Sequence, residues 1–196
     1  MSKLIGPNIC RRRAMALTGL GLLGLHSAPA LARAKLSDDG LYQMDWYLES
    51  FLDLREDLAS ATENGKRFAI MWGLKGCPAC KRMHEVHMMD LKIESYIREN
   101  FEILHLNILG SRVVTDFDGI KVAEKPFSVA YDVHGTPTIQ FFPERPDGLA
   151  KLKPQAREVE RIPGLPEPGA FLAMFRYVRE KGYETAPFSE WLKKQA

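Results

Sequence analysis

The chain has 196 residues, of which 45% are hydrophobic and 27% are charged, so it is long enough for one domain with a complete apolar core. Its formal net charge is only +2 at pH 7, and no basic segment is interleaved with aromatic residues. Proteins that bind nucleic acids carry a basic surface of that kind, so the composition excludes nucleic acid as an expected partner.

The first 34 residues have the pattern of a secretory signal peptide. Arg11–Arg13 form a basic start, an uncharged apolar run follows, and overlapping Ala-x-Ala sequences lie within Ala28–Ala34. The apolar run is too short for a membrane anchor, which needs about 20 residues. The sequence therefore predicts a signal peptide over 1–34, a mature domain over 35–196 and a periplasmic location. The adjacent arginines favour twin-arginine export.

Removal of this segment changes both the charge and the cysteine content. The segment contains five basic residues and no acidic residue, so 22 basic residues remain against 25 acidic ones and the net charge becomes −3. Cys10 is removed with it, and Cys77 and Cys80 are the cysteines that remain. We expect no stable membrane insertion after the signal peptide is removed.

The first half of the mature domain alternates between helical and strand patterns. Apolar residues recur at helical spacing over 45–64, and Gly65 follows as a stop signal. The run 67–72 is almost continuously apolar and predicts a buried strand, and a helix is expected from 78 to about 88. The next predicted elements are a short helical segment over 95–99, a strand over 101–107, a loop insertion over 110–119 and a helix over 124–131.

The second half predicts two strands and two helices. A strand over 138–142 is followed by a turn-rich connection and a returning strand over 157–162. A strongly amphipathic helix covers 168–181, and a small helix covers 188–194. A βαβ unit followed by two strands and a helix predicts an α/β domain with a central mixed sheet flanked by helices.

The motif Cys77-Pro78-Ala79-Cys80 is the predicted reactive site of this chain. The motif lies between a predicted buried strand and a predicted helix, which is the context typical of thiol–disulfide exchange. If Pro78 opens the helix, Cys77 lies at its N-terminus, where the helix dipole favours a thiolate. A disulfide this local closes almost no chain and adds little stability, so the pair indicates chemistry rather than a structural link.

The order of attack follows from this placement. A thiolate attacks a disulfide sulfur, and a second thiol resolves the resulting mixed disulfide. Cys77, at the expected exposed helix start, is the predicted nucleophile, and Cys80, one turn into the helix, is the predicted resolving thiol.

A second motif, Gly135-Thr136-Pro137-Thr138, directly precedes an apolar strand. Because proline cannot donate to a sheet ladder, Pro137 predicts a turn there. Together the order of elements, the C-P-A-C motif and Thr136-Pro137 resemble a thioredoxin-fold oxidoreductase over about 64–181. The resemblance implies that Pro137 is cis and lies beside the cysteines. It also implies that Thr136, Pro78 and Ala79 contact the substrate.

A narrower set of motifs resembles the exported thioredoxins that accompany bacterial sulfur-oxidation (Sox) systems. That resemblance implies periplasmic reduction of protein disulfides or of sulfur-carrier thiols, with an electron donor in the inner membrane. The motifs are Asp53–Leu58, Lys75–Cys80, Met83–Val86, Val114–Gly119 and Phe175–Lys181.

Two positions depart from ordinary thioredoxins. Gly76 stands where those proteins have Trp directly before the first cysteine, and Met71 replaces the buried Asp that assists proton transfer. The proton acceptor for Cys80 is therefore open between Lys75, Glu85 and water.

Other residues admit simpler interpretations. His84 and His87 follow Cys80 at helical spacing, but four ligands along one helix start would not converge on tetrahedral zinc, so surface or partly packed histidines are expected. His105, within an apolar strand, is expected to be a hydrogen-bonded core residue. Asp116 and Asp118 are expected in a solvated loop. No metal or cofactor is predicted.

The leading prediction is therefore a periplasmic thiol:disulfide oxidoreductase that acts on protein cysteines, in the direction of a reductase. An oxidase or isomerase remains open within the same chemistry. The alternative from another class is a carrier of a metal or a sulfur intermediate that uses the same cysteines with His84 or His87.

Overall fold

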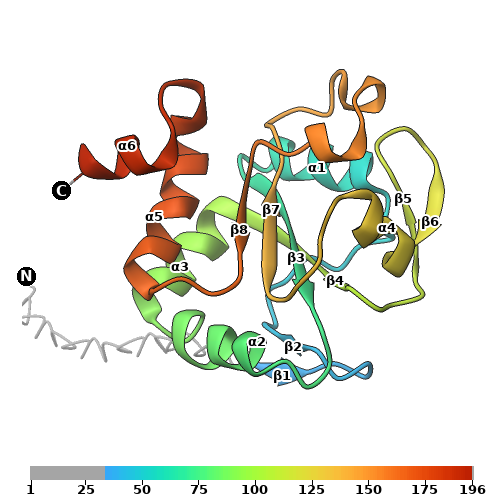
Figure 1. The fold of residues 1–196 in the computed structure, drawn as a ribbon, viewed down its shortest axis with the longest axis horizontal. Helices are drawn as coiled ribbons and strands as arrows, with labels where there is room; N and C mark the ends of the chain where they lie inside the picture. Colours follow the sequence, from blue (N-terminus) through green and yellow to red (C-terminus); the bar gives the residue numbers. More distant parts are fainter. Residues whose placement is uncertain (1–33, 196) are drawn as a thin grey trace, which may run out of the picture. The chain divides into compact units, whose positions relative to one another are not determined.

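The computed structural model describes residues 34–195, so residues 1–33 of the predicted signal peptide lie outside the described part (Figure 1). Within 34–195, each helix is too short or too polar to cross a membrane. The helices are α1 (Leu54–Glu63), α2 (Pro78–Arg82), α3 (Leu91–Asn100), α4 (Glu124–Ala130), α5 (Pro168–Arg179) and α6 (Phe188–Lys193). The strands are β1 (Lys35–Leu36), β2 (Tyr42–Gln43), β3 (Arg67–Gly73), β4 (Phe101–Asn107), β5 (Val113–Thr115), β6 (Lys121–Ala123), β7 (Thr138–Phe141) and β8 (Glu160–Pro163).

The centre of the domain is a four-stranded sheet in the order β4-β3-β7-β8. The pair β3 and β4 is parallel, while β7 lies antiparallel to both β3 and β8. The connection from β3 to β4 runs through α2 and α3, as a parallel crossover requires. This arrangement confirms the α/β fold class with a mixed sheet that the sequence predicts.

Alternate residues of β3 enter two separate cores, because successive side chains of a strand point to opposite faces. Ala69 and Met71 pack with residues of α3 and α5 on one face. Phe68, Ile70 and Trp72 pack with residues of α1 and α4 on the other. The sheet is therefore covered by helices on both faces (Figure 1).

The predicted helix over 45–64 is wrong in its first half, because α1 begins only at Leu54. The preceding segment is irregular. Tyr47 and Leu52 pack into the core separately, whereas Phe51 is fully exposed. The Leu48 amide donates to the Ile103 carbonyl at 2.9 Å, and Leu52 has a left-handed φ of 64°. Asp53 then caps α1 by accepting from the amide of Arg55 at 3.1 Å.

The insertion between β4 and α4 is an antiparallel hairpin of β5 and β6 rather than an irregular loop. Of its two acidic residues, Asp118 is exposed as expected, and it lies 2.7 Å from the Arg157 guanidinium. Asp116 is instead buried and lies 2.6 Å from the same guanidinium. The Tyr131 hydroxyl also donates to Asp116 at 2.6 Å. These carboxylates therefore hold the hairpin on the segment that leads into β8.

Candidate active site

Cys77 and Cys80 form a disulfide at the start of α2, with their Cα atoms 5.3 Å apart. Pro78 occupies the first turn of the helix, where its missing N–H costs nothing, and Cys77 is the N-cap residue. The Cys80 amide donates to Cys77 Sγ at 3.1 Å. This hydrogen bond and the helix dipole both favour negative charge on Cys77.

Both cysteines are nearly buried, so Cys77 is less exposed than the sequence predicts. Cys77 retains 8% of its surface and Cys80 retains 2%. Cys77 is therefore the more accessible of the two, in keeping with the predicted order of attack.

The structure brings the second motif against the first. The Thr136–Pro137 peptide bond is cis, and the Thr136 carbonyl oxygen lies 3.5 Å from Cys77 Sγ. The Pro137 carbonyl accepts a hydrogen bond from the Gly164 amide at 2.8 Å, which joins this turn to the loop after β8. Cys77, Thr136 and Pro137 thus meet in one place, although they come from separate parts of the chain.

A surface cavity of about 340 Å³ opens beside the dithiol. Pro78 and Ala79, which the sequence assigns to substrate contact, both line it. The other lining residues are Arg82, His87, Leu165, Pro166 and Glu167. The lining thus combines apolar side chains with one cation, Arg82, and one carboxylate, Glu167.

A cluster of buried polar rings, which the sequence interpretation missed, lies behind the dithiol. His84 is on the same helical run as Cys80, and its Nδ1 lies 2.8 Å from the Cys80 carbonyl oxygen. Its Nε2 lies 2.9 Å from the Tyr47 hydroxyl, which is also 3.2 Å from Met71 Sδ. His105 completes the group, with its ring centre 5.8 Å from that of His84 and 5.6 Å from that of Tyr47.

A π-helical turn over Met83–His87 continues α2 and contains both His84 and His87. Such turns occur often at functional sites. Both histidines are buried, so the prediction of surface or partly packed histidines is wrong. The spacing of four residues between Cys80 and His84 was the one sequence signal for this contact, because residues that far apart share a helix face.

The two histidines do not converge with the cysteines on a common point. His84 contacts Tyr47 and the Cys80 carbonyl, whereas His87 Nε2 lies 2.8 Å from the Pro166 carbonyl oxygen. Within the described residues, no group of three or more His, Cys, Asp or Glu side chains is arranged to hold a metal ion. The contacts of both rings therefore suit packing and hydrogen bonding within the protein.

His105 is buried but is not hydrogen-bonded as expected. Neither ring nitrogen has a hydrogen-bond partner among the residues that the structure describes. A Cβ atom on Gly73 would lie 2.5 Å from His105 Nε2, so a residue without a side chain is needed there. Burial lowers the pKa of His105 to about 3 and that of His84 to about 4, so both rings are neutral at pH 7.

Comparisons with known proteins agree with this geometry. The family described as thioredoxin-like domain matches residues 54–179. A thioredoxin-fold protein from Helicobacter pylori is 23% identical, with a TM-score of 0.50 over 67% of this chain and 80% of that one. A thioredoxin from Thermus thermophilus is also 23% identical, with a TM-score of 0.48 over 65% of this chain and 84% of that one. None of the curated protein sequences compared with the chain matches it.

The likeness to the Helicobacter pylori protein concerns the fold alone, while the family match covers most of the described domain. The match includes β3, the C-P-A-C motif, the cis-proline turn and all of α5. The chain belongs to the thioredoxin-like domain family.

Proposed function

We propose that this protein is a thiol:disulfide oxidoreductase that exchanges disulfides with cysteines of other proteins. The observation that carries the proposal is the Cys77–Cys80 disulfide at the start of a helix, with Cys77 Sγ 3.5 Å from the Thr136 carbonyl oxygen. Family membership supports it, as does the position of Cys77, which is less deeply buried than Cys80. In this reaction Cys77 forms the mixed disulfide and Cys80 resolves it.

The finer proposal is reduction of protein disulfides in the periplasm, which would keep a sulfur-carrier cysteine or another partner thiol in its active, reduced form. Its support is the signal-peptide pattern of residues 1–34 and the resemblance of five motifs to the exported thioredoxins of Sox systems. A reductase in that oxidising compartment requires electrons from a donor in the inner membrane.

Replacement of Cys80 by Ala tests the activity directly. The Cys80→Ala protein should trap substrate proteins as mixed disulfides through Cys77, because no thiol remains to resolve them. Cys77→Ala is the matched control and should trap none, since the nucleophile is absent. Non-reducing gels followed by identification of the trapped chains give the readout. No trapped partner, with no reduction of insulin disulfides by the unaltered protein, would refute the proposal.

The direction of electron flow is tested by the equilibrium potential of the Cys77–Cys80 pair in glutathione buffers. A value near the thioredoxin end of the range, about −270 mV, is expected for a reductase. A value near about −120 mV would instead assign the protein to disulfide formation.

A further inference from the structure

The cavity of about 340 Å³ beside the dithiol has two walls that come from separate parts of the chain. Helix α2 and its π-helical extension contribute Pro78, Ala79, Arg82 and His87. Residues 165–167, in the loop between β8 and α5, form the opposite wall. The shape of the cavity therefore depends on how this loop is held against α2 and its extension.

Two hydrogen bonds hold this loop, residues 164–167, in place. The Gly164 amide donates to the Pro137 carbonyl oxygen at 2.8 Å, which ties the loop to the cis-proline turn. His87 Nε2 lies 2.8 Å from the Pro166 carbonyl oxygen, and the imidazole is the donor because a carbonyl oxygen only accepts. The loop is thus bound both to the turn that contacts Cys77 and to the helical segment that Cys77 caps.

The loop has few free backbone torsions. Pro163, Pro166 and Pro168 each fix φ, and Gly164 takes a left-handed φ of 79°. Leu165 packs against the core on the α5 side of the sheet. Because so few torsions can adjust, a restraint at one residue also positions its neighbours. The hydrogen bond at Pro166 therefore sets the distance between the whole loop and α2.

His87 is a polar residue in an apolar environment, and it retains only 2% of its surface. Its ring packs edge-on against Phe171 of α5, with the ring centres 5.1 Å apart. Its Nδ1 atom is buried without a hydrogen-bond partner among the described residues, which costs stability. An apolar side chain would pack beside Phe171 without that cost. Among the described residues, the bond to Pro166 is thus the one contact that needs a polar side chain at this position.

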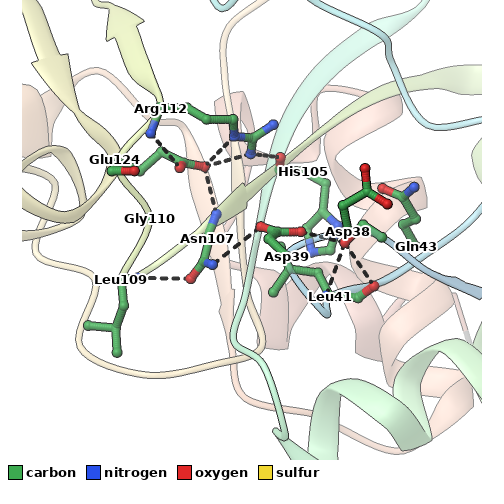
Figure 2. A pocket seen from close by; sticks show the side chains of 12 residues that line it. Asp38, Asp39, Leu41, Gln43, His105, Asn107, Leu109, Gly110, Arg112 and Glu124 are labelled. Atoms are coloured by element: carbon green, nitrogen blue, oxygen red, sulfur yellow. Dashed lines mark hydrogen bonds and ion pairs between the residues drawn. The ribbon is translucent and has the colours of Figure 1, made fainter.

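A larger cavity of about 550 Å³ lies between the β1–β2 hairpin and the end of β4 (Figure 2). Its charged side chains bond to other residues of the same cavity. Arg112 pairs with Glu124, and the Asn107 side-chain amide donates to Asp39 at 3.3 Å. Its lining includes no residue of the motif 77–80. The smaller cavity is therefore the better placed of the two to receive a group that neighbours the reacting disulfide.

The lining of the smaller cavity favours an apolar group. Its two prolines, Ala79 and Leu165 present apolar atoms on both walls. Arg82 and Glu167 carry opposite charges, so the lining has no net charge that would select a charged side chain. The volume of about 340 Å³ lies within the range of ligand pockets in proteins and leaves room for one side chain.

We propose that His87 is a positioning residue that holds the loop 164–167 against α2 and so shapes a cavity for an apolar side chain beside the substrate disulfide. This inference rests on the proposed function and deepens it, because it names a feature by which the protein selects its substrates. His87 acts through the Pro166 carbonyl rather than on the sulfur atoms themselves.

The bonds that form and break are those of the proposed function. The Cys77 thiolate attacks the substrate disulfide and expels the first substrate thiolate. Cys80 loses its proton to water, attacks Cys77 Sγ, closes the Cys77–Cys80 disulfide and expels the second substrate thiolate. The dithiol loses the two electrons that the substrate gains, and water protonates the released thiolates. A side chain bound in the cavity holds the substrate during these steps, so it lowers the substrate concentration that is needed.

The test uses two short peptides that differ at one residue. Each has a single cysteine preceded by Leu or by Gly, and each is joined to a second copy of itself as a disulfide. The full-length protein is reduced with dithiothreitol, freed of the reagent and mixed with each peptide dimer. Loss of the peptide disulfide is followed over a single turnover, and the Cys77→Ala protein gives the background from Cys10.

The unaltered protein should prefer the Leu peptide. Its half-saturating concentration should be about tenfold lower for that peptide, because burial of a leucine side chain stabilises binding by a factor of at least this order. The limiting rates for the two peptides should be similar, since the reacting groups are the same. The preference is a ratio measured within one protein, so a loss of folded protein in a variant does not change it.

His87→Asn and His87→Gln are a matched pair of amide variants. The Gln amide reaches as far along the side chain as imidazole Nε2 and can donate to Pro166, whereas the shorter Asn amide cannot. The preference for the Leu peptide should fall from about tenfold to below about threefold in His87→Asn and stay near about tenfold in His87→Gln.

Two further variants keep the test decisive. If His87→Asn does not fold, His87→Leu takes its place, since leucine packs beside Phe171 and cannot donate. Ala79→Leu fills the cavity from the opposite wall and should reduce the preference in the same way. An unchanged preference without the donor, or an equal loss in His87→Gln, would overturn the role of His87. An unchanged preference in Ala79→Leu would overturn the role of the cavity.

The outcome is separable from that of the proposed function. A reduced, unaltered protein that reduces neither the peptide dimers nor insulin refutes the function. One that reduces both peptide dimers with the same half-saturating concentration keeps the function and refutes the selection of an apolar side chain.

Discussion

At the residue scale, the site consists of a recognisable dithiol and an unusual set of neighbours. Cys77 and Cys80 occupy the positions that the motif predicts, and the cis-proline turn contacts Cys77. Where a carboxylate stands in ordinary thioredoxins, Met71 here contacts a tyrosine that is hydrogen-bonded to His84. The rings of Tyr47 and His84 beside Met71 are neutral at pH 7, because burial raises the pKa of Tyr47 and lowers that of His84 to about 4.

These neutral histidines predict a loss of stability in acid. The pKa of His84 is lowered by burial to about 4 from an ordinary value of 6.5, so below pH 6.5 the unfolded chain binds a proton that the folded protein excludes. Stability is complete above that pH and falls until about pH 4. From pH 7.5 to 5 the free energy of unfolding should drop by about 2 kcal/mol more in the unaltered protein than in His84→Gln.

Urea denaturation at a series of pH values measures this difference. Parallel curves for the two proteins would show that His84 titrates normally and would contradict the lowered pKa.

At the scale of elements, the β5–β6 hairpin is held by a buried ion pair. Arg157, in the segment before β8, contacts both Asp116 and Asp118 of the hairpin, and Tyr131, which follows α4, bonds to Asp116. Ion pairs of this kind stabilise little in total, but removal of one partner leaves a charge buried and unpaired. The hairpin therefore depends on Arg157 for its position.

Arg157→Met should lower the free energy of unfolding by about 3–5 kcal/mol, because Asp116 remains buried without its cation. Arg145→Met is the matched control, since Arg145 forms an ion pair of 2.9 Å with Asp147 at an exposed position. Its effect should stay below about 1 kcal/mol. Chemical denaturation of both variants gives the comparison, and equal effects would show that the buried pair does not anchor the hairpin.

At the scale of the whole molecule, the sheet and its helices are joined by aromatic packing. Phe101, Phe141 and Phe175 come from β4, β7 and α5, and their ring centres lie 4.9–5.8 Å apart in edge contacts. Such pairs add about 0.5–1.5 kcal/mol each beyond the burial of their surface. This group holds α5 on the sheet and so fixes the loop that faces the cis-proline turn.

Phe141→Ala should destabilise the protein by about 3–5 kcal/mol through the cavity it leaves, because Phe141 is fully buried. Phe51→Ala provides the control, since Phe51 is 100% exposed and its loss should change stability by less than about 0.5 kcal/mol. Thermal or urea unfolding distinguishes them. Similar stabilities for the two variants would mean that the aromatic group does not hold the core together.

The sequence by itself determined the dithiol, the turn at Pro137 and most of the sheet, because these depend on local signals, whereas the cis state of Pro137 was implied only by the family resemblance. A continuous apolar run marks β3, Pro78 marks a helix start, and Pro137 marks a turn before a strand. The helix predicted over 45–53 is wrong, because Tyr47 and Leu52 pack into the core from an irregular segment in which Phe51 is fully exposed.

Only the tertiary structure decided the surroundings of the dithiol. Periodicity shows which face of an element is apolar, but not which polar side chains from distant segments meet there. Tyr47, His84 and His105 each look like an isolated residue in the sequence, and their contacts exist because packing of the N-terminal segment, the helix after Cys80 and β4 places them against Met71. Burial, which lowers the pKa of both histidines, is likewise a property of the assembled core.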